Sequence, residues 1–187
     1  MQLRISTMPI SRFVLAAAIT VTASQALAQD AGFPPRRDGL WEVVTVTEKP
    51  DKVPKVTARM CVDRATDADL MGYGLKMSKD TCPRYETSRK GQTWVIDSQC
   101  KVGPVTTTAK AQVSGDFQSS VKVRMDGTTE GMPGTNGPQP LRMTQTARWV
   151  SEACEGMKPG DVVLDGGIKV NVKQLKQLQK LLPGLLR

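Results

Sequence analysis

Segments of alternating hydrophobic and polar residues make up most of the chain between residues 40 and 150. In the last of them, Leu141, Met143 and Trp149 occupy one side of the alternation, and Arg142 and Arg148 the other. Because successive side chains of a β-strand point to opposite faces, this period predicts a strand with one polar, basic face in water. Alternation, or enrichment in β-branched residues, predicts strands at 40–48, 55–63, 84–90, 92–100, 104–114, 117–126 and 141–150.

The breaks between several of these segments contain a glycine, in the sequences KGQ, KVG and SGD, which suits short hairpin turns. The period changes in Thr66–Ser78, where apolar residues recur at helical spacing. Thr66 and Asp69 resemble a capping box, so we predict that a short helix begins there. We predict that the Gly/Pro-rich segment Gly127–Pro140 is a long loop, either a binding loop or a mobile one, and its composition favours mobility.

Residues 167–187 form a basic amphipathic tail, which follows a predicted small hairpin at Asp165–Gly167. Asn171 is the expected N-cap of its helix. Such a helix suits an anionic membrane surface or a groove on a partner, but its leucines could instead pack back on the open face of the sheet. The candidate interaction surface consists of a leucine stripe and neighbouring lysines: Leu175, Leu178, Leu182, Lys173, Lys176 and Lys180.

The first 28 residues have the features of a secretory signal peptide. Arg4 and Arg12 precede the apolar run Phe13–Val21, and Ala26 and Ala28 form an A-x-A cleavage site. The run is far shorter than the roughly 20 residues that a membrane-spanning helix needs. We therefore predict a cleaved signal peptide (1–28), no transmembrane segment after cleavage, and a single exported β-rich domain (29–187) that begins with a loose arm at residues 29–38.

Four cysteines follow the predicted signal peptide: Cys61, Cys82, Cys100 and Cys154. An even number in an exported chain predicts two disulfides. A zinc site is disfavoured, because the chain has no histidine and no C-x-x-C spacing. Cys82 and Cys100 flank a predicted hairpin with Gly91 at its turn, but the type of turn decides whether they lie opposite each other or on a diagonal.

The position of the predicted helix discriminates between the pairings. If the helix only joins two strands at one end of the sheet, Cys154 lies at the other end without a partner. If the helix crosses the sheet, Cys61 and Cys154 share one end, and Cys82 and Cys100 share the other. About 13 helical residues rise about 20 Å, close to the length of a six-residue strand. We therefore predict the pairs Cys61–Cys154 and Cys82–Cys100.

Composition excludes several kinds of chemistry. Without histidine there can be no Ser-His-Asp or Cys-His site, and phosphate-binding, dinucleotide-binding and calcium-binding motifs are absent. The formal net charge of +8 favours anionic partners, although both signs are interspersed along the chain. We therefore expect a non-enzymatic protein without catalytic residues, metal or cofactor, and no nucleic-acid partner. Trp41, Trp94 and Trp149 lie in predicted strands and are expected to pack in the core.

Several short motifs occur in a recognisable order: DGLWEVV, MCVD, a later TC, a W…C pair, TARWVSEAC and GMKPGDVV. In this order, and with its four cysteines, the chain resembles an exported bacterial family known as the domain of unknown function numbered 3617. The resemblance covers roughly Gly39 to Val163. It implies a periplasmic or secreted protein of a Gram-negative bacterium, and it assigns no activity and no catalytic residues.

The predicted fold is mainly β, an antiparallel curved sheet or half-open barrel with one crossing helix and a C-terminal amphipathic helix. Two functional classes fit this fold. The first is a periplasmic or secreted binding or interaction module for an unknown protein partner or an anionic envelope surface. The alternative is a lipocalin-like carrier of a small apolar ligand. A carrier needs an enclosed apolar cavity, whereas an interaction module needs an exposed apolar patch.

Overall fold

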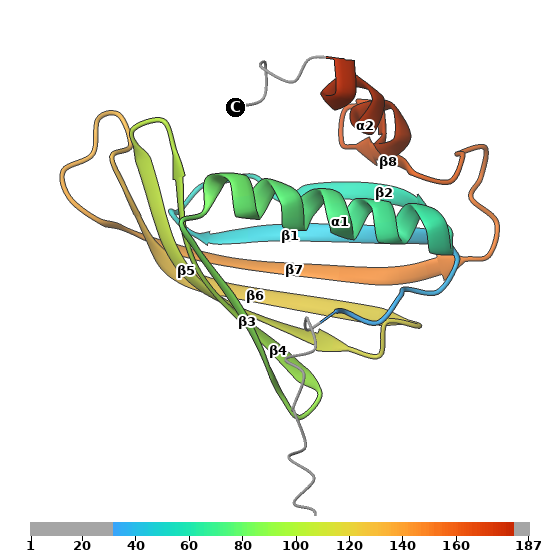
Figure 1. Cartoon of the computed structure of the whole chain (residues 1–187), viewed down its shortest axis with the longest axis horizontal. Coiled ribbons are helices and arrows are strands. Elements are labelled where there is room, and N and C mark those ends of the chain that lie inside the picture. Colours follow the sequence, from blue (N-terminus) through green and yellow to red (C-terminus); the bar gives the residue numbers. More distant parts are fainter. Residues whose placement is uncertain (1–31, 182–187) are drawn as a thin grey trace, which may run out of the picture.

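A computed structural model describes residues 32–181, excluding the side chains of 72–79, 176 and 178–181, so the predicted signal peptide lies outside the described residues. Nine strands form one antiparallel sheet in the order β3-β4-β5-β6-β7-β1-β2-β8-β9 (Figure 1). The strands are β1 (Gly39–Lys49), β2 (Val56–Val62), β3 (Arg84–Lys90), β4 (Thr93–Val102), β5 (Val105–Gly115), β6 (Ser120–Glu130), β7 (Gln139–Ser151), β8 (Asp161–Leu164) and β9 (Lys169–Asn171).

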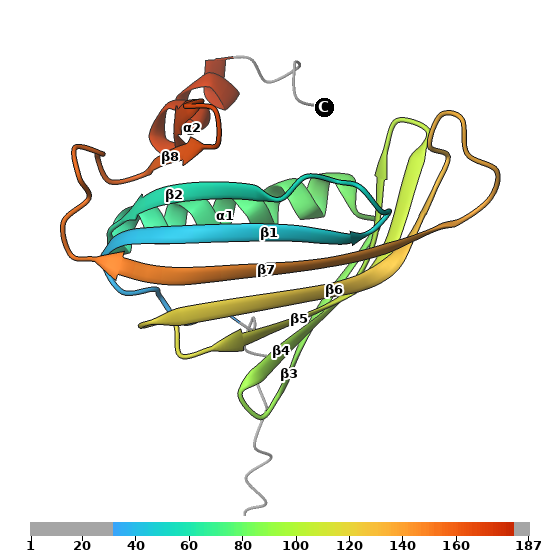
Figure 2. The ribbon, with the colours of Figure 1, turned by 180° about the vertical axis from the view of Figure 1, so that it is seen from behind.

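The sheet is strongly curved, and the helix α1 (Arg64–Thr81) covers one of its faces. The helix lies in front of β1 and β2 in Figure 1 and behind them in the reverse view of Figure 2. The sheet remains open, with β3 and β9 at its edges. The predicted fold class is therefore confirmed, as an open curved sheet rather than a closed barrel.

The start of α1 corrects the predicted capping box. The helix begins at Arg64, and its N-cap is Asp63 rather than Thr66. The backbone N–H of Thr66 donates to the Asp63 carboxylate at 2.7 Å, and the Asp63 N–H donates to the Thr66 hydroxyl at 3.0 Å. This reciprocal pair satisfies two backbone donors that a helix start leaves unpaired. It also holds the pKa of Asp63 below its usual value, chiefly through the hydrogen bond from the Thr66 N–H.

The predicted Gly127–Pro140 loop is shorter than expected. β6 continues to Glu130 and β7 already begins at Gln139, so the connection contains only residues 131–138. The residues that extend β6 pair with strands on both sides: Thr128 lies opposite Thr108 of β5 and Pro140 of β7. β-Branched threonines suit such a position, and ladder pairing on both sides outweighs the turn signal of Gly127.

The core lies on the inner face of the sheet. Trp41 and Trp94 are fully or almost fully buried, and Trp149 is half-buried against the same cluster, as expected for all three tryptophans. The outer face is polar, and Arg142 pairs there with Asp126 at 2.8 Å. The alternation within 141–150 thus identified correctly which face of β7 meets water.

The two disulfides tie opposite ends of the sheet. The structure joins Cys61 to Cys154 and Cys82 to Cys100, the pairs expected from a crossing helix. Cys61 lies opposite Leu40 at the start of β1. The strand pairing that starts at Cys100 continues across β5 and β6 to Gln139, the first residue of β7. Cys100 therefore lies at the opposite end of the sheet from Cys61. The helix α1 therefore runs from one end of the sheet to the other.

The C-terminal helix α2 (Val172–Leu181) follows β9 and has the expected N-cap, because the Lys173 N–H donates to the Asn171 side-chain oxygen at 3.0 Å. The contacts of α2 are mainly with α1 and β9. Apart from the half-buried Leu175, the leucines of the predicted stripe lie outside the described side chains, so the alternative in which they cover the open face of the sheet stays a prediction. Val172 in its first turn is buried.

Candidate ligand-binding cavity

A cavity of about 530 Å³ lies between the concave face of the sheet, α1 and the N-terminal arm, which we define as residues 32–38. The side chains that form its floor are small or medium-sized and apolar. They come from β1, β5, β6 and β7: Val43, Ala111, Val113, Val121, Val123 and Ala147. From the opposite side, Leu70 and Met71 of α1 close over this floor.

The arm lines one end of the cavity. Phe33 packs against Trp94 and Phe117, with ring centroids 5.7 and 6.3 Å away. Trp94 and Phe117 meet edge to face at 5.3 Å, so the three rings form one aromatic cluster. The Arg37 N–H donates to the Phe117 carbonyl at 2.9 Å. The arm was expected to be loose, but its aromatic ring and backbone contacts fix it to the domain.

A buried ion pair lies beside this cluster. The Arg36 side chain meets Asp67 in the first turn of α1 at 2.8 Å, through both Nε and Nη2. The Arg36 backbone N–H also donates to the other carboxylate oxygen of Asp67 at 2.8 Å. Both Asp67 oxygens thus have donors within the protein, and the guanidinium lies 5.8 Å from the Trp41 ring. The pair brings opposite charges together at the cavity wall.

Neutral polar side chains occupy other parts of the wall. Gln145 of β7 donates through Nε2 to the Thr45 hydroxyl at 3.2 Å, within the row of inward-facing residues. Ser98 of β4 donates to the Ala109 carbonyl at 3.4 Å. Cys100, which forms a disulfide with Cys82, lies two residues further along the same strand. The cavity therefore combines a mostly apolar surface with a few hydroxyl and amide groups, as is common in sites for small molecules.

Of the predicted interaction surface on the tail, the described side chains of Lys173 and Leu175 do not line this cavity. Lys173 is exposed and Leu175 is half-buried. The side chains of Lys176, Leu178 and Lys180, and the whole of Leu182, lie outside the described residues. Sequence reasoning missed Phe33, Arg36, Asp67 and Gln145. The phenylalanine and the two arginines of the arm were the available signal for the first two.

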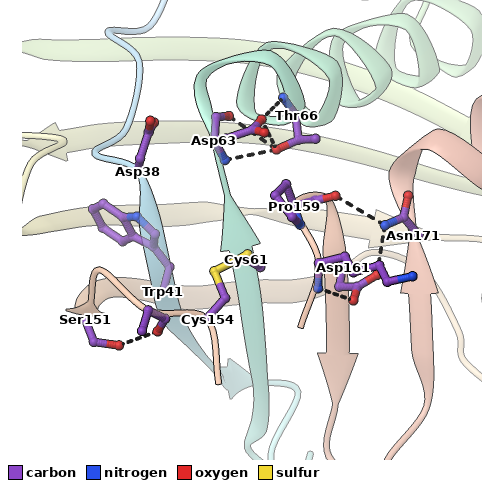
Figure 3. Close-up of a disulfide and its surroundings, with 12 residues drawn as sticks. Asp38, Trp41, Cys61, Asp63, Thr66, Ser151, Cys154, Pro159, Asp161 and Asn171 are labelled. Carbon is purple, nitrogen blue, oxygen red and sulfur yellow. Dashed lines mark hydrogen bonds between the residues drawn. A yellow bond between two sulfur atoms is a disulfide. The ribbon is translucent and has the colours of Figure 1, made fainter. Parts of the chain in front are cut away.

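A second cluster anchors the C-terminal hairpin close to the Cys61–Cys154 disulfide (Figure 3). The buried Asp161 accepts hydrogen bonds from the Asn171 side chain at 2.8 Å and the Lys158 N–H at 2.7 Å, and pairs with Lys169 at 2.7 Å. Burial alone would raise the pKa of Asp161. The donors from Asn171, Lys169 and Lys158 outweigh that effect and hold the pKa below its usual value. This cluster fixes β8, β9 and the start of α2 to one another.

Residues 32–181 contain no helix of sufficient length and hydropathy to span a bilayer. Within the part of the chain that the structure describes, no three His, Cys, Asp or Glu side chains lie close enough together to hold a metal ion.

An open, curved antiparallel sheet with a covering helix, and a partly open, mostly apolar cavity between them, defines the structural class of this protein. The profile of a family described as "Protein of unknown function (DUF3617)" matches residues 36–154, and the chain belongs to that family. The resemblance inferred from the motifs is thus confirmed, although the GMKPGDVV motif (Gly156–Val163) lies beyond the matched residues. No curated protein and no solved structure matches the chain.

Proposed function

We propose that this protein is a carrier that binds a small apolar molecule in the cavity beneath α1. The observation behind this proposal is the cavity itself, which has a volume of about 530 Å³ and mostly apolar walls. Ligand sites usually measure about 300–1,000 Å³ and combine such walls with a few polar groups. Leu178 and Leu182 of the predicted interaction surface lie outside the described side chains, so the proposal rests on the cavity alone.

We place this carrier outside the cytoplasm, in the periplasm or as a secreted protein. Two disulfides support this location, because such bonds form and persist in oxidising compartments. The signal-peptide pattern of residues 1–28 supports it independently. An apolar molecule that crosses an aqueous compartment needs its surface shielded from water, which a cavity of this kind would provide.

Native mass spectrometry of protein purified from its own periplasm tests the carrier function. We expect a retained ligand in the unmodified protein. Ala111→Phe places a ring in the floor of the cavity and should abolish retention, whereas Gln112→Phe adds the same ring on the exposed outer face of the next position and should not. Val123→Phe is a second blocking variant should Ala111→Phe fail to fold, as judged by circular dichroism.

The carrier function is contradicted if the unmodified protein retains no ligand and also fails to take up N-phenyl-1-naphthylamine, a neutral fluorescent probe of apolar sites. Equal uptake of this probe by Ala111→Phe, Val123→Phe and Gln112→Phe would also contradict it, because binding would then occur elsewhere.

A further inference from the structure

We infer that the cavity selects an uncharged amphiphile, a molecule with an apolar chain or ring system and one hydroxyl or carbonyl group that hydrogen-bonds to Gln145. This inference rests on the proposed carrier function and specifies the chemical class of its ligand. It follows from three features of the wall: the state of its charges, the position of the Gln145 amide, and the apolar surface around it.

The charges in the described part of the wall cancel each other. Among the described residues that line the cavity, the charged ones are Arg36 and Asp67. They are joined at 2.8 Å, and the side chain of Asp67 is only 3% exposed. A ligand carboxylate or phosphate would have to compete with Asp67 for Arg36, and a ligand ammonium would have to compete with Arg36 for Asp67. Either exchange would leave a charge buried without its partner, which is strongly unfavourable.

The Gln145 amide can satisfy a neutral polar group. One of its N–H bonds is used on the Thr45 hydroxyl, at 3.2 Å. A primary amide offers two donors and an acceptor oxygen, so a donor and the oxygen remain, and no other described residue binds them. The residue is half-buried in the cavity wall, where a hydrogen bond to a ligand would be partly shielded from water.

The side chains next to Gln145 define where the apolar part of the ligand would lie. Val123 is its direct neighbour across β6, and Val113 follows in the same row on β5. Ala147 is the next inward-facing residue on β7 itself. These residues line the cavity between Gln145 and the aromatic cluster of Phe33 and Phe117. A molecule bound to the amide by its polar group would therefore direct its apolar part toward these rings.

A matched series of amphiphiles tests the inference. Decanol, decanoate and decylammonium share one chain length and differ in the charge of the head group. Each is titrated near neutral pH against the full mature chain loaded with N-phenyl-1-naphthylamine, and displacement of the probe gives the affinity. We expect decanol to bind at least about tenfold more tightly than either ion, because either ion would lose hydration without gaining a partner.

Two variants and one control identify the residues responsible. Gln145→Leu keeps a similar volume but removes the amide, so it should weaken decanol binding about three- to tenfold. Gln112→Leu makes the same change on the exposed face and should leave all three affinities unchanged. Asp67→Asn leaves the charge of Arg36 unbalanced, so it should raise the affinity of decanoate relative to decanol.

The outcomes separate this inference from the proposed function. Binding of decanoate or decylammonium as tight as that of decanol would overturn the selection for uncharged ligands while supporting a carrier. Equal decanol affinities in Gln145→Leu and Gln112→Leu would overturn the role of the amide. If neither the probe nor any of the three amphiphiles binds, the carrier function itself fails.

Discussion

Arg36 and Asp67 form a buried ion pair that fastens the N-terminal arm to the first turn of α1. The exposed fractions of their side chains are 13% and 3%, and two guanidinium nitrogens approach one carboxylate oxygen. The backbone N–H of Arg36 binds the other oxygen. The pair therefore depends on the position of the arm as well as on the charges. Loss of either partner would affect both the end of the cavity and the start of the helix that covers it.

Arg36→Met should lower the free energy of unfolding by about 3–5 kcal/mol, because it leaves the Asp67 carboxylate buried without its cation. The double variant Arg36→Met/Asp67→Leu should lose less, since no charge then remains buried. Urea unfolding followed by tryptophan fluorescence measures both values.

Arg59 and Glu155 provide the matched control. This ion pair lies on the surface, with side chains 42% and 55% exposed, and surface pairs contribute at most about 1 kcal/mol. Arg59→Met should therefore change stability far less than Arg36→Met. Similar losses in the two variants would show that the Arg36–Asp67 pair has no special role.

Phe33→Ala should accelerate the release of a bound neutral probe several-fold. Phe33 contributes one ring of the aromatic cluster at the end of the cavity, with Trp94 and Phe117. Without this ring, that end has less apolar surface to hold the probe and a weaker anchor for the arm. Stopped-flow fluorescence of N-phenyl-1-naphthylamine measures the release rate. Pro35→Ala changes an exposed position of the same arm, and equal rates in both variants would contradict the assigned role of Phe33.

Removing the Cys61–Cys154 bridge should destabilise the protein more than removing Cys82–Cys100. The bridges span sequence separations of 93 and 18 residues. Because a longer closed loop restricts the unfolded chain more, the chain-entropy model gives about 4–5 kcal/mol for the first and about 3 kcal/mol for the second. Paired Cys→Ala variants and urea unfolding measure the difference. Non-reducing peptide mapping checks the pairing independently, and a peptide that joins Cys61 to Cys82 would contradict it.

Asp161→Asn should destabilise the protein by about 1–3 kcal/mol at neutral pH, because it weakens the buried contacts to Lys169 and Lys158. The folded state lowers the pKa of Asp161. Its contribution to stability is therefore complete above the unfolded value of about 3.9 and is lost as the pH falls through the folded value.

The difference in stability between wild type and Asp161→Asn should accordingly shrink once the pH falls below about 4. Chemical unfolding at a series of pH values tests this. Asp97→Asn, at a surface pair with Lys110, should show only a small effect at any pH. A constant difference between wild type and Asp161→Asn over the whole range would exclude the proposed linkage.

Sequence patterns were sufficient to predict the sheet and the cysteine pairs. Alternation, or enrichment in β-branched residues, identified seven strands, and the segment Arg84–Lys90 was predicted with its observed bounds. The cysteine pairing followed from a single distance argument, in which the helix is long enough to cross the sheet. That argument succeeded because strand and helix lengths are set by backbone geometry, which does not depend on side-chain detail.

The cavity could not be predicted from the same patterns. Alternation shows that Ala111, Val123 and Ala147 face inward, but it does not show whether inward-facing side chains from distant strands meet. That depends on the curvature of the sheet and on the height at which α1 and the arm lie above it.

The arm was wrongly predicted to be loose for a related reason. Phe33 has its partners Trp94 and Phe117 far away in sequence, so no local pattern indicates that it is ordered.

The position of β1 in the sheet determines when the domain can fold. β3 to β7 follow one another as neighbouring hairpins, but β1 lies between β2 and β7, and Leu40 pairs with Ser151. Such long-range pairing requires the closure of a large loop before any contact forms, which slows folding. During synthesis, which starts at the N-terminus, β1 can therefore pair only with β2 until β7 has been made. The cavity, which needs β1, β7 and α1 together, can be completed only after that step.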